Sequence, residues 1–378
     1  MAMWGVTSAN NLTIKVWSKK FFYEMPKYSF FVSRFAGSFI DRKGMNTSEQ
    51  NQFIKDGTKL DGGDNNPVHV LQELKGQKGD KVTFGLVYEL DEDTGTVGND
   101  TLEGNEQAVD TDDSYVELEQ YRNAVRSQGR LDRMRSDLEF EPTAKSRLNN
   151  WAAAKIDILC KTALITSPTE IYYYDHANTR MAVTATTGTA SLALGSTSKI
   201  SPHIIRTLKA AAVTGRDEQR NKMVPIEHGG EEYYVLLVPS DVGVDMQENS
   251  EFQNYIKAAY AQKTGKFPLF KNCVCIVDNV IVHVYNRMPI YAAVAGTATV
   301  PWAHCSFMGA QALAIAFGVD PFIVAKSFDY GNQIGIAINF IFGVTKPSFT
   351  HPRSAFTFDN SSFSVYLTRG QYSDITLA

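Results

Sequence analysis

The chain has 378 residues, a formal net charge of −4 and a pI near 6.0. That balance gives no global case for nucleic-acid binding, and the sequence lacks any run of about 18 apolar residues that would span a membrane. With 43% hydrophobic and 21% charged residues, we expect a soluble globular protein of one large or two ordinary domains. Four cysteines and the absence of a basic-then-apolar leader predict synthesis and folding in a reducing cytoplasm.

The first 45 residues are rich in aromatic and basic side chains. Ten aromatic residues are interleaved with seven Lys or Arg residues, and only Glu24 and Asp41 oppose these cations. Because aromatic residues and arginine are favoured at buried interfaces, we predict an arm that lies across a neighbouring molecule. Its predicted contact residues are Trp17, Phe21 and Phe22. Packing of the segment on its own domain and contact with nucleic acid stay open as alternatives.

Two strands with alternating hydrophobicity, residues 79–90 and 114–126, flank an acidic stretch. The apolar face of the first strand consists of Val82, Phe84, Leu86 and Tyr88, which is the period-two pattern of a half-buried strand. The 23 residues between the strands hold nine acidic residues and no Lys or Arg. A two-stranded ribbon is marginally stable by itself, and this one ends in a self-repelling tip. We therefore expect a second copy of the chain to cover the apolar face.

The same reasoning predicts basic residues around the acidic tip. The tip residues assigned to a subunit interface are Asp91, Asp93, Glu103 and Glu106. Their predicted partners on a neighbouring copy are Arg122, Arg126, Arg130, Arg133 and Arg135, or the lysines of the arm. A calcium loop fits poorly, because Gly95 and Leu102 stand at the fifth and twelfth positions counted from Asp91, where oxygen ligands are needed. Loose binding of a cation by the tip stays open.

A long helix is predicted over residues 142–165. Pro142 suits the first helical position, where its missing N–H costs nothing. An apolar stripe with spacings of three and four follows: Leu148, Ala152, Ile156, Leu159 and Ala163. At 1.5 Å per residue the helix would run roughly 35 Å, a length suited to a structural spine.

Shorter elements follow the long helix. Residues 171–174 and 233–238 predict strands, and Ser201 with Pro202 predicts the start of a helix that runs to about residue 213. A hairpin is predicted over 273–277 and 280–284, with its turn at Asp278-Asn279, and an apolar strand over 334–344. Because helices and strands are interspersed without regular βαβ alternation, the predicted fold class is α+β.

Motifs for catalysis are absent from the sequence. It contains no phosphate-binding loop, dinucleotide fingerprint, nucleophile elbow or HExxH zinc motif. One set of residues has the composition of a zinc site: Cys273, Cys275, His283, His304 and Cys305. In a hairpin with a two-residue turn, both Cys273 and Cys275 would face one side and His283 the other. An odd-length loop would reverse this, so the zinc alternative stays open, but we predict no catalytic residue, no cofactor and no metal site.

Short blocks in a fixed order along nearly the whole chain resemble one protein family. They are WSKKFFY at 17–23, GDKVTF at 79–84, TLEGNE at 101–106, QYRNAV at 120–125, the helix around Trp151 and Asp157, FPLF at 267–270, GAQA at 309–312, FDYGN at 328–332 and GVTK at 343–346. Each block is weak alone, whereas the ordered set resembles the major capsid proteins of N-four-like podophages (Schitoviridae type).

The resemblance implies the Hong Kong 97 fold of tailed-phage shells and encapsulin compartments. The implied organisation is an N-terminal arm at 1–67, an extended E-loop at 68–135, a P-domain with a spine helix at 136–200, an A-domain at 201–327 and a return to the P-domain at 328–378. It also implies an icosahedral virion shell of hexamers and pentamers that encloses double-stranded DNA and is assembled in the bacterial cytoplasm. Implied partners are a portal protein and scaffolding or decoration proteins. An encapsulin-like compartment and a metal-dependent enzyme remain alternative functions.

Overall fold

The computed structural model describes residues 29–35, 66–71, 79–88, 90, 95–99, 101–131, 140–166, 170–175, 180–184, 198–214, 223–228, 230–262, 273–291, 301–350, 357–358 and 363–368. Its helices are α2 (Phe30–Phe35), α5 (Phe140–Ile165), α6 (Pro202–Thr214), α7 (Ser240–Glu248), α8 (Ser250–Gln262) and the short 3₁₀ helix η2 (Asp329–Gly331). Its strands are β1 (Val68–Leu71), β2 (Lys81–Val87), β3 (Thr111–Glu117), β4 (Glu119–Arg126), β5 (Glu170–Asp175), β6 (Arg180–Thr184), β7 (Ile226–His228), β8 (Glu231–Val238), β9 (Cys275–Val277), β10 (Val280–Val284), β11 (Ile290–Tyr291), β12 (Trp302–Met308), β13 (Leu313–Phe328), β14 (Gln333–Thr345), β15 (Phe349–Thr350), β16 (Thr357–Phe358) and β17 (Phe363–Thr368). None of these helices is both long and apolar enough to cross a membrane.

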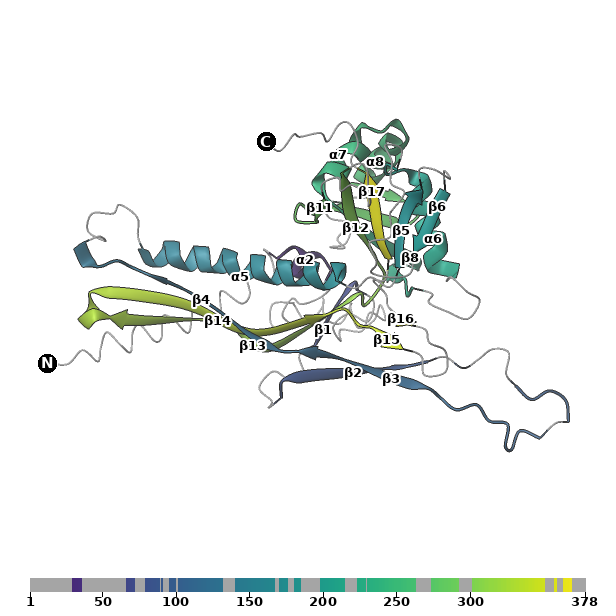
Figure 1. Ribbon diagram of the computed structural model, residues 1–378, viewed down its shortest axis with the longest axis horizontal. Coiled ribbons are helices and arrows are strands. Elements are labelled where there is room, and N and C mark those ends of the chain that lie inside the picture. The colour runs from purple at the N-terminus through teal and green to yellow at the C-terminus, as the bar shows by residue number, and fades with distance from the viewer. Residues whose placement is uncertain are drawn as a thin grey trace, which may run out of the picture.

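A four-stranded sheet and helix α5 form the elongated half of the molecule (Figure 1). The strand order is β1-β13-β14-β4, with β1 parallel to β13 and the other pairs antiparallel. Helix α5 buries Leu148, Ala152 and Ile156 in a cluster that also contains Phe340 and Ile338 of β14. We call this cluster the spine core. The apolar stripe thus predicted the helix correctly, and the observed helix begins only two residues earlier, at Phe140.

A nine-stranded sheet forms the other half. Its main path is β6-β5-β17-β12-β8-β10-β9, and β11 and β7 pair with β12 and β8 at its margins. Alternate residues of β8 enter two different cores: Val235 and Leu237 join the spine core, whereas Leu236 and Val238 join a second cluster, here called the outer core. Burial on both faces explains why residues 233–238 form a continuous apolar run in the sequence.

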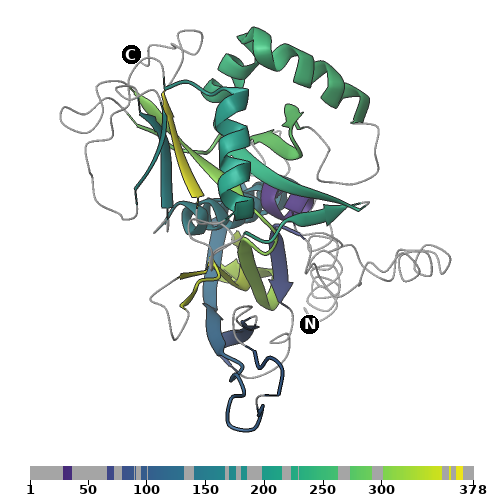
Figure 2. The same ribbon diagram turned by 90° about the vertical axis from the view of Figure 1, so that its right-hand side faces the viewer.

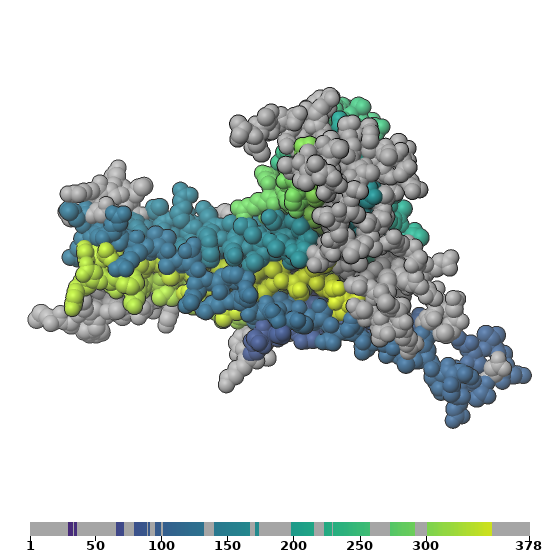
Figure 3. Space-filling model, viewed as in Figure 1, coloured from purple at the N-terminus to yellow at the C-terminus, as the bar shows by residue number. Residues whose placement is uncertain are grey.

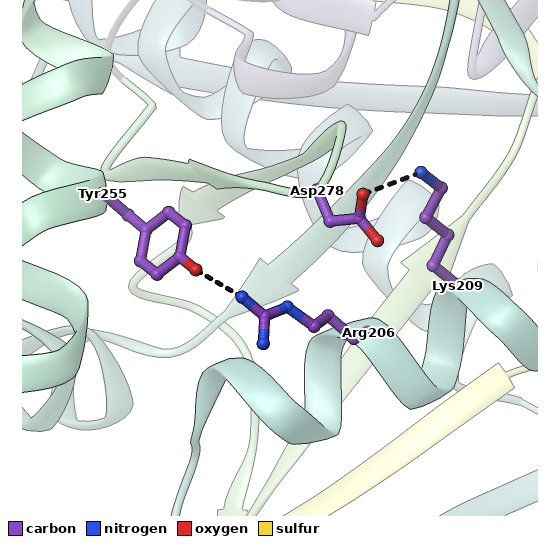
Figure 4. Close-up of polar contacts among 4 residues, drawn as sticks. All are labelled: Arg206, Lys209, Tyr255 and Asp278. Carbon is purple, nitrogen blue, oxygen red and sulfur yellow. Dashed lines mark hydrogen bonds and ion pairs between the residues drawn. The ribbon is translucent and has the colours of Figure 1, made fainter.

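Helix α6 packs on the outer core, and Figure 2 shows the helix beside the nine-stranded sheet. The predicted cap is present, since the backbone N–H of Ile204 donates to Ser201 Oγ at 3.4 Å. Polar contacts fasten this helix to its neighbours: Lys209 Nζ lies 3.2 Å from Asp278 Oδ1 in the β9–β10 turn, and Arg206 donates to the hydroxyl of Tyr255 in α8 (Figure 4). These contacts hold α6 against the β9–β10 turn and against α8.

The β9–β10 hairpin has the predicted two-residue turn. Cys275 pairs with Val282, and both Asp278 and Asn279 have positive φ values, 49° and 62°, as turns of this length require. The two cysteines nevertheless point to different sides: Cys273 lies in the spine core and Cys275 in the outer core. The prediction that both share one face is wrong, because β9 begins only at Cys275 and Cys273 precedes the regular strand.

The predicted strand 114–126 is divided between two sheets. Its first part belongs to β3, which pairs with β2, and its second part is β4, which pairs with β14. Leu118 stands between the two strands and belongs to neither. The alternation of the sequence is continuous through this point, so it could not show that the chain changes its pairing partner.

The sheets also divide the chain differently from the predicted domain boundaries. The nine-stranded sheet contains β5 and β6, which the prediction placed in the segment 136–200 together with the spine helix. It also contains β17, which the prediction placed in the return segment 328–378. Strand β13 pairs along its length with β14 of the four-stranded sheet, although the prediction placed all of β13 except its last residue in the segment 201–327. Only long-range pairing determines these memberships, and the local patterns of the strands do not encode it.

Candidate subunit interface

The base of the β2–β3 ribbon is packed on its own chain. Val82 and Val116 are 7% and 0% exposed and form a small cluster with Leu71 of β1 and Ala314 and Ala316 of β13. The Phe84 ring packs against this cluster and meets the ring of Phe349 edge-on, with 6.0 Å between the centroids. The prediction that a neighbouring copy covers Val82 is therefore wrong, because the ribbon folds back over its own sheet. Leu86 and Tyr88 are half-buried.

A glycine makes this crossing possible. A Cβ atom at Gly343 of β14 would lie 2.2 Å from the carbonyl oxygen of Glu117 and 2.6 Å from Val116 Cγ1, distances that no side chain tolerates. Gly318 of β13 lies close to a side chain instead, with 2.9 Å from an added Cβ to Leu118 Cδ1. The close backbone approach at Gly343 is a common reason for glycine inside strands.

Beyond its base the ribbon continues into a tip that projects from the body at one end of the long axis (Figure 3). Beyond β2 and β3 the two segments of the ribbon are still joined by the bond from Tyr88 N–H to the carbonyl of Asp110, 3.0 Å long. The predicted residues Glu103 and Glu106 are exposed, and Glu106 accepts a hydrogen bond from the backbone N–H of Gly104 at 2.8 Å. Four large apolar side chains of the tip are also more than half exposed: Leu90, Val97, Leu102 and Val109. The tip thus combines acidic and apolar groups.

The predicted basic residues of β4 lie on the side of the four-stranded sheet that faces away from α5. Tyr121 and Val125 pack on the spine core, so Arg122 and Arg126, which alternate with them, point to the opposite face. The guanidinium of Arg126 lies 4.4 Å from the centroid of the Phe328 ring. Exposed Val324 and Lys326 of β13 belong to the same face. Arg130 is exposed as well, and its backbone N–H donates to Asn332 Oδ1 at 3.0 Å.

Several predicted residues lie outside the described residues, namely Trp17, Phe21, Phe22, Asp91, Asp93, Arg133 and Arg135. The described part of the arm, helix α2, behaves as the alternative interpretation expects. Phe31 and Phe35 are fully buried in the chain's own spine core. For residues 29–35 the prediction of an arm that lies across a neighbour is therefore wrong, since these residues fill the molecule's own core.

The sequence analysis did not identify the polar group that holds α2. Asp157 of α5 accepts hydrogen bonds from Ser29 Oγ at 2.7 Å and from the backbone N–H groups of Phe30 and Phe31 at 3.1 and 3.3 Å. Burial raises the pKa of Asp157, and these hydrogen bonds lower it in part. One signal was present in the sequence: Asp157 follows Ile156 on the apolar side of the predicted helix, where a carboxylate requires a partner.

Buried thiols and histidines contribute no clustered site within the described part of the chain. All four cysteines are buried and none forms a disulfide bond, and burial raises the pKa of the Cys160 and Cys305 thiols, which disfavours reactive thiolates. No three His, Cys, Asp or Glu side chains among the described residues lie together as a metal ion would need.

The buried His304 should make the fold sensitive to acid. Burial lowers its pKa from 6.5 to about 4, so the unfolded chain takes up a proton at a higher pH than the folded chain does. Stability from this residue is complete above about pH 6.5 and decreases as the pH falls to about 4, by roughly 3 kcal/mol in total. Denaturant unfolding at several pH values checks this against His304→Gln, which should show a weaker loss over the same range. Equal pH dependence in the two proteins would contradict the assignment.

The arrangement of an elongated sheet with a spine helix, a projecting ribbon and a second sheet at one end is that of the Hong Kong 97 fold. Solved structures share it: the capsid of Ralstonia phage GP4 matches with a TM-score of 0.69 at 23% identity, covering 90% of this chain and 91% of that one. The Cyanophage Pam1 capsid matches with a TM-score of 0.60 at 15% identity, covering 81% and 90%. These likenesses show the fold.

The family follows from the sequence match. The family model described as "Phage capsid protein" matches residues 5–355, and the chain belongs to this family. The "Major capsid protein" of Pseudomonas phage KPP25 is 26% identical over 342 residues, covering 82% of this chain and 87% of the relative. The protein is accordingly a structural component of a phage capsid and not an enzyme.

Proposed function

We propose that this chain is the major capsid protein of an N-four-like tailed phage, whose copies form the hexamers and pentamers of an icosahedral shell around double-stranded DNA. The observation that carries the shell function is the family match over residues 5–355, supported by the fold. The finer assignment to the N-four-like type is supported by the ordered sequence blocks. The proposed place of the protein is the virion, with assembly in the host cytoplasm beside portal and scaffolding or decoration proteins.

The sheets support a revised assignment of the domains. We assign the E-loop to the β2–β3 ribbon and its tip, the P-domain to α5 with the four-stranded sheet, and the A-domain to the nine-stranded sheet with α6, α7 and α8. The N-terminal arm precedes α2.

Electron microscopy of the expressed protein tests this function. Closed shells are the expected result, and a uniformly monomeric protein under assembly conditions would contradict it. The contents of particles isolated from phage-producing cells distinguish a genome shell, which holds DNA, from an encapsulin-like compartment, which holds a cargo protein.

Contacts between the acidic tip and the basic face should depend on charge. In the proposed shell, Glu103 and Glu106 of one copy face Arg122 and Arg126 of the next. Exposed ion pairs contribute little individually, but they direct association and make it sensitive to salt. Arg122→Glu should therefore slow assembly at low salt by about tenfold or more, and adding Glu103→Arg to the same chain should restore part of the rate.

Lys257→Glu provides the matched control, because it reverses one exposed charge on α8, away from the proposed contact. Light scattering during assembly measures all three variants. An equal effect of Arg122→Glu and Lys257→Glu would show that only net charge matters and that this contact is absent.

A further inference from the structure

Helix α2 lies where the two halves of the molecule meet. In Figure 1 it stands beside α5, close to the nine-stranded sheet. Phe31, Val32 and Phe35 are at most 3% exposed and share the spine core with residues from both sheets. A helix of six residues is too short to be stable alone. Its conformation therefore depends on the surfaces it joins.

One side of α2 is fastened to the spine helix by polar contacts. Asp157 receives three donors from the start of α2, and Ser29 Oγ also accepts from the Val32 N–H at 3.5 Å. Asp157 thus caps a helix that is remote in sequence, satisfying N–H groups that lack partners within the helix. The guanidinium of Arg34, one turn further along, lies 4.5 Å from the centroid of the Phe30 ring.

The other side of α2 is fastened to the nine-stranded sheet by aromatic contacts. The Phe30 ring stacks on Tyr285, just after β10, with 4.6 Å between centroids, and the Phe31 ring meets Tyr285 edge-on at 5.3 Å. The Phe35 ring meets the buried His283 of β10 at 5.4 Å. Arg287, two residues beyond Tyr285, donates to the carbonyl of Ala154 in α5 at 3.2 Å. Helix α2 therefore contacts the end of β10 close to the segment at Arg287 that is bonded to the spine helix α5.

We propose that α2 is a clasp that sets the angle between the spine helix with its sheet and the nine-stranded sheet, and that this angle determines the curvature of the shell. The inference rests on the proposed shell function. Contacts between identical subunits close into a shell only if the rotation between neighbours has the right value. A small change of angle inside every subunit is repeated at every contact, so it alters the diameter or prevents closure.

The test compares Asp157→Ala with a control that weakens the same core elsewhere. Ile336 is 1% exposed and belongs to the spine core, but it pairs with Val125 only three residues after β14 begins at Gln333, and the connection from β13 to β14 lies at the end of the sheet away from α2 in Figure 1. Ile336→Ala should lower stability without touching the clasp. Asp157→Asn, which keeps one acceptor oxygen, and Ser29→Ala are milder variants to be used if Asp157→Ala does not fold.

The expected result is at least a tenfold faster hydrogen exchange of the amides of residues 30–35 in Asp157→Ala, together with open sheets, tubes or a broadened distribution of shell diameters. Ile336→Ala should give shells of normal diameter. Normal diameters in the clasp variants despite faster exchange, or equal distortion by Ile336→Ala, would overturn the inference and leave the shell function intact. Absence of shells from the unaltered protein would instead contradict the shell function itself.

Discussion

Replacing residues 89–109 by Asn-Gly is expected to abolish closed shells while leaving a folded chain. The cut follows the structure: the Tyr88 N–H donates to the Asp110 carbonyl just beyond the paired strands β2 and β3, and Asn-Gly forms the two-residue turn that such a pair accepts. A deletion that extends to Asp113, the last residue before the strand predicted over 114–126, would remove the first residues of β3, which begins at Thr111.

The physical reason lies in the exposure of the tip. Leu90, Val97, Leu102 and Val109 are 55–82% exposed, so their removal costs the isolated chain little apolar burial. In the proposed shell the same side chains would be covered by a neighbour. At about 25 cal/mol per Å², burial of a few hundred Å² contributes several kcal/mol per contact, and many repeated contacts hold the shell.

Two measurements decide this prediction. Thermal unfolding of the monomer should be unchanged within a few degrees, and electron microscopy should show no closed particles. Gly95→Ala is the control inside the tip, because its new Cβ would meet no atom within 4 Å, and it should assemble normally. Normal shells from the Asn-Gly variant would show that the tip is dispensable for assembly.

Gly343→Ala should destabilise the fold by roughly 3 kcal/mol or more. Its Cβ would collide with the backbone of Glu117, and backbone cannot rotate away as a side chain does. Either the ribbon lifts from β14 or the sheet distorts, and both lose the packing of Val82 and Val116 on β13. Overpacking of this kind is among the few mechanisms by which a single substitution greatly lowers the free energy of unfolding.

Gly85→Ala is the matched control on the same ribbon. Its Cβ would lie 3.6 Å from the Asp112 carbonyl oxygen, which is an ordinary contact, so little change in stability is expected. Urea unfolding gives the free energies of both variants. If Gly343→Ala unfolds at the same urea concentration as the unaltered protein, the crossing is not as tight as described.

Elements with a local signal were predictable from the sequence. The apolar stripe of α5 and the Asp278-Asn279 turn each depend on residues only a few positions apart, and the structure confirms both. The alternation of Val82, Phe84 and Leu86 likewise predicted a strand, now β2. The resemblance of the ordered blocks led to the capsid family, which the family match confirms.

The candidate interface was predictable only in part. Composition identified the acidic tip and the exposed arginines of β4, and Glu103, Glu106, Arg122 and Arg126 are indeed exposed. The same pattern misassigned Val82, because an alternating strand shows that one face is apolar but not which surface covers it. Asp157 was missed as a cap because its partners, Ser29, Phe30 and Phe31, are more than 120 residues away in the sequence.

By itself the sequence determined helix α5, strand β2, the Asp278-Asn279 turn and the acidic composition of the tip, since each depends on neighbours a few residues apart. Tertiary structure alone decided that 114–126 changes sheets at Leu118, that β17 joins the nine-stranded sheet, and that α2 fills the junction beneath Asp157. Periodicity shows which face of a segment is apolar. The surface that covers this face is decided only when segments distant in the sequence pack together in one core.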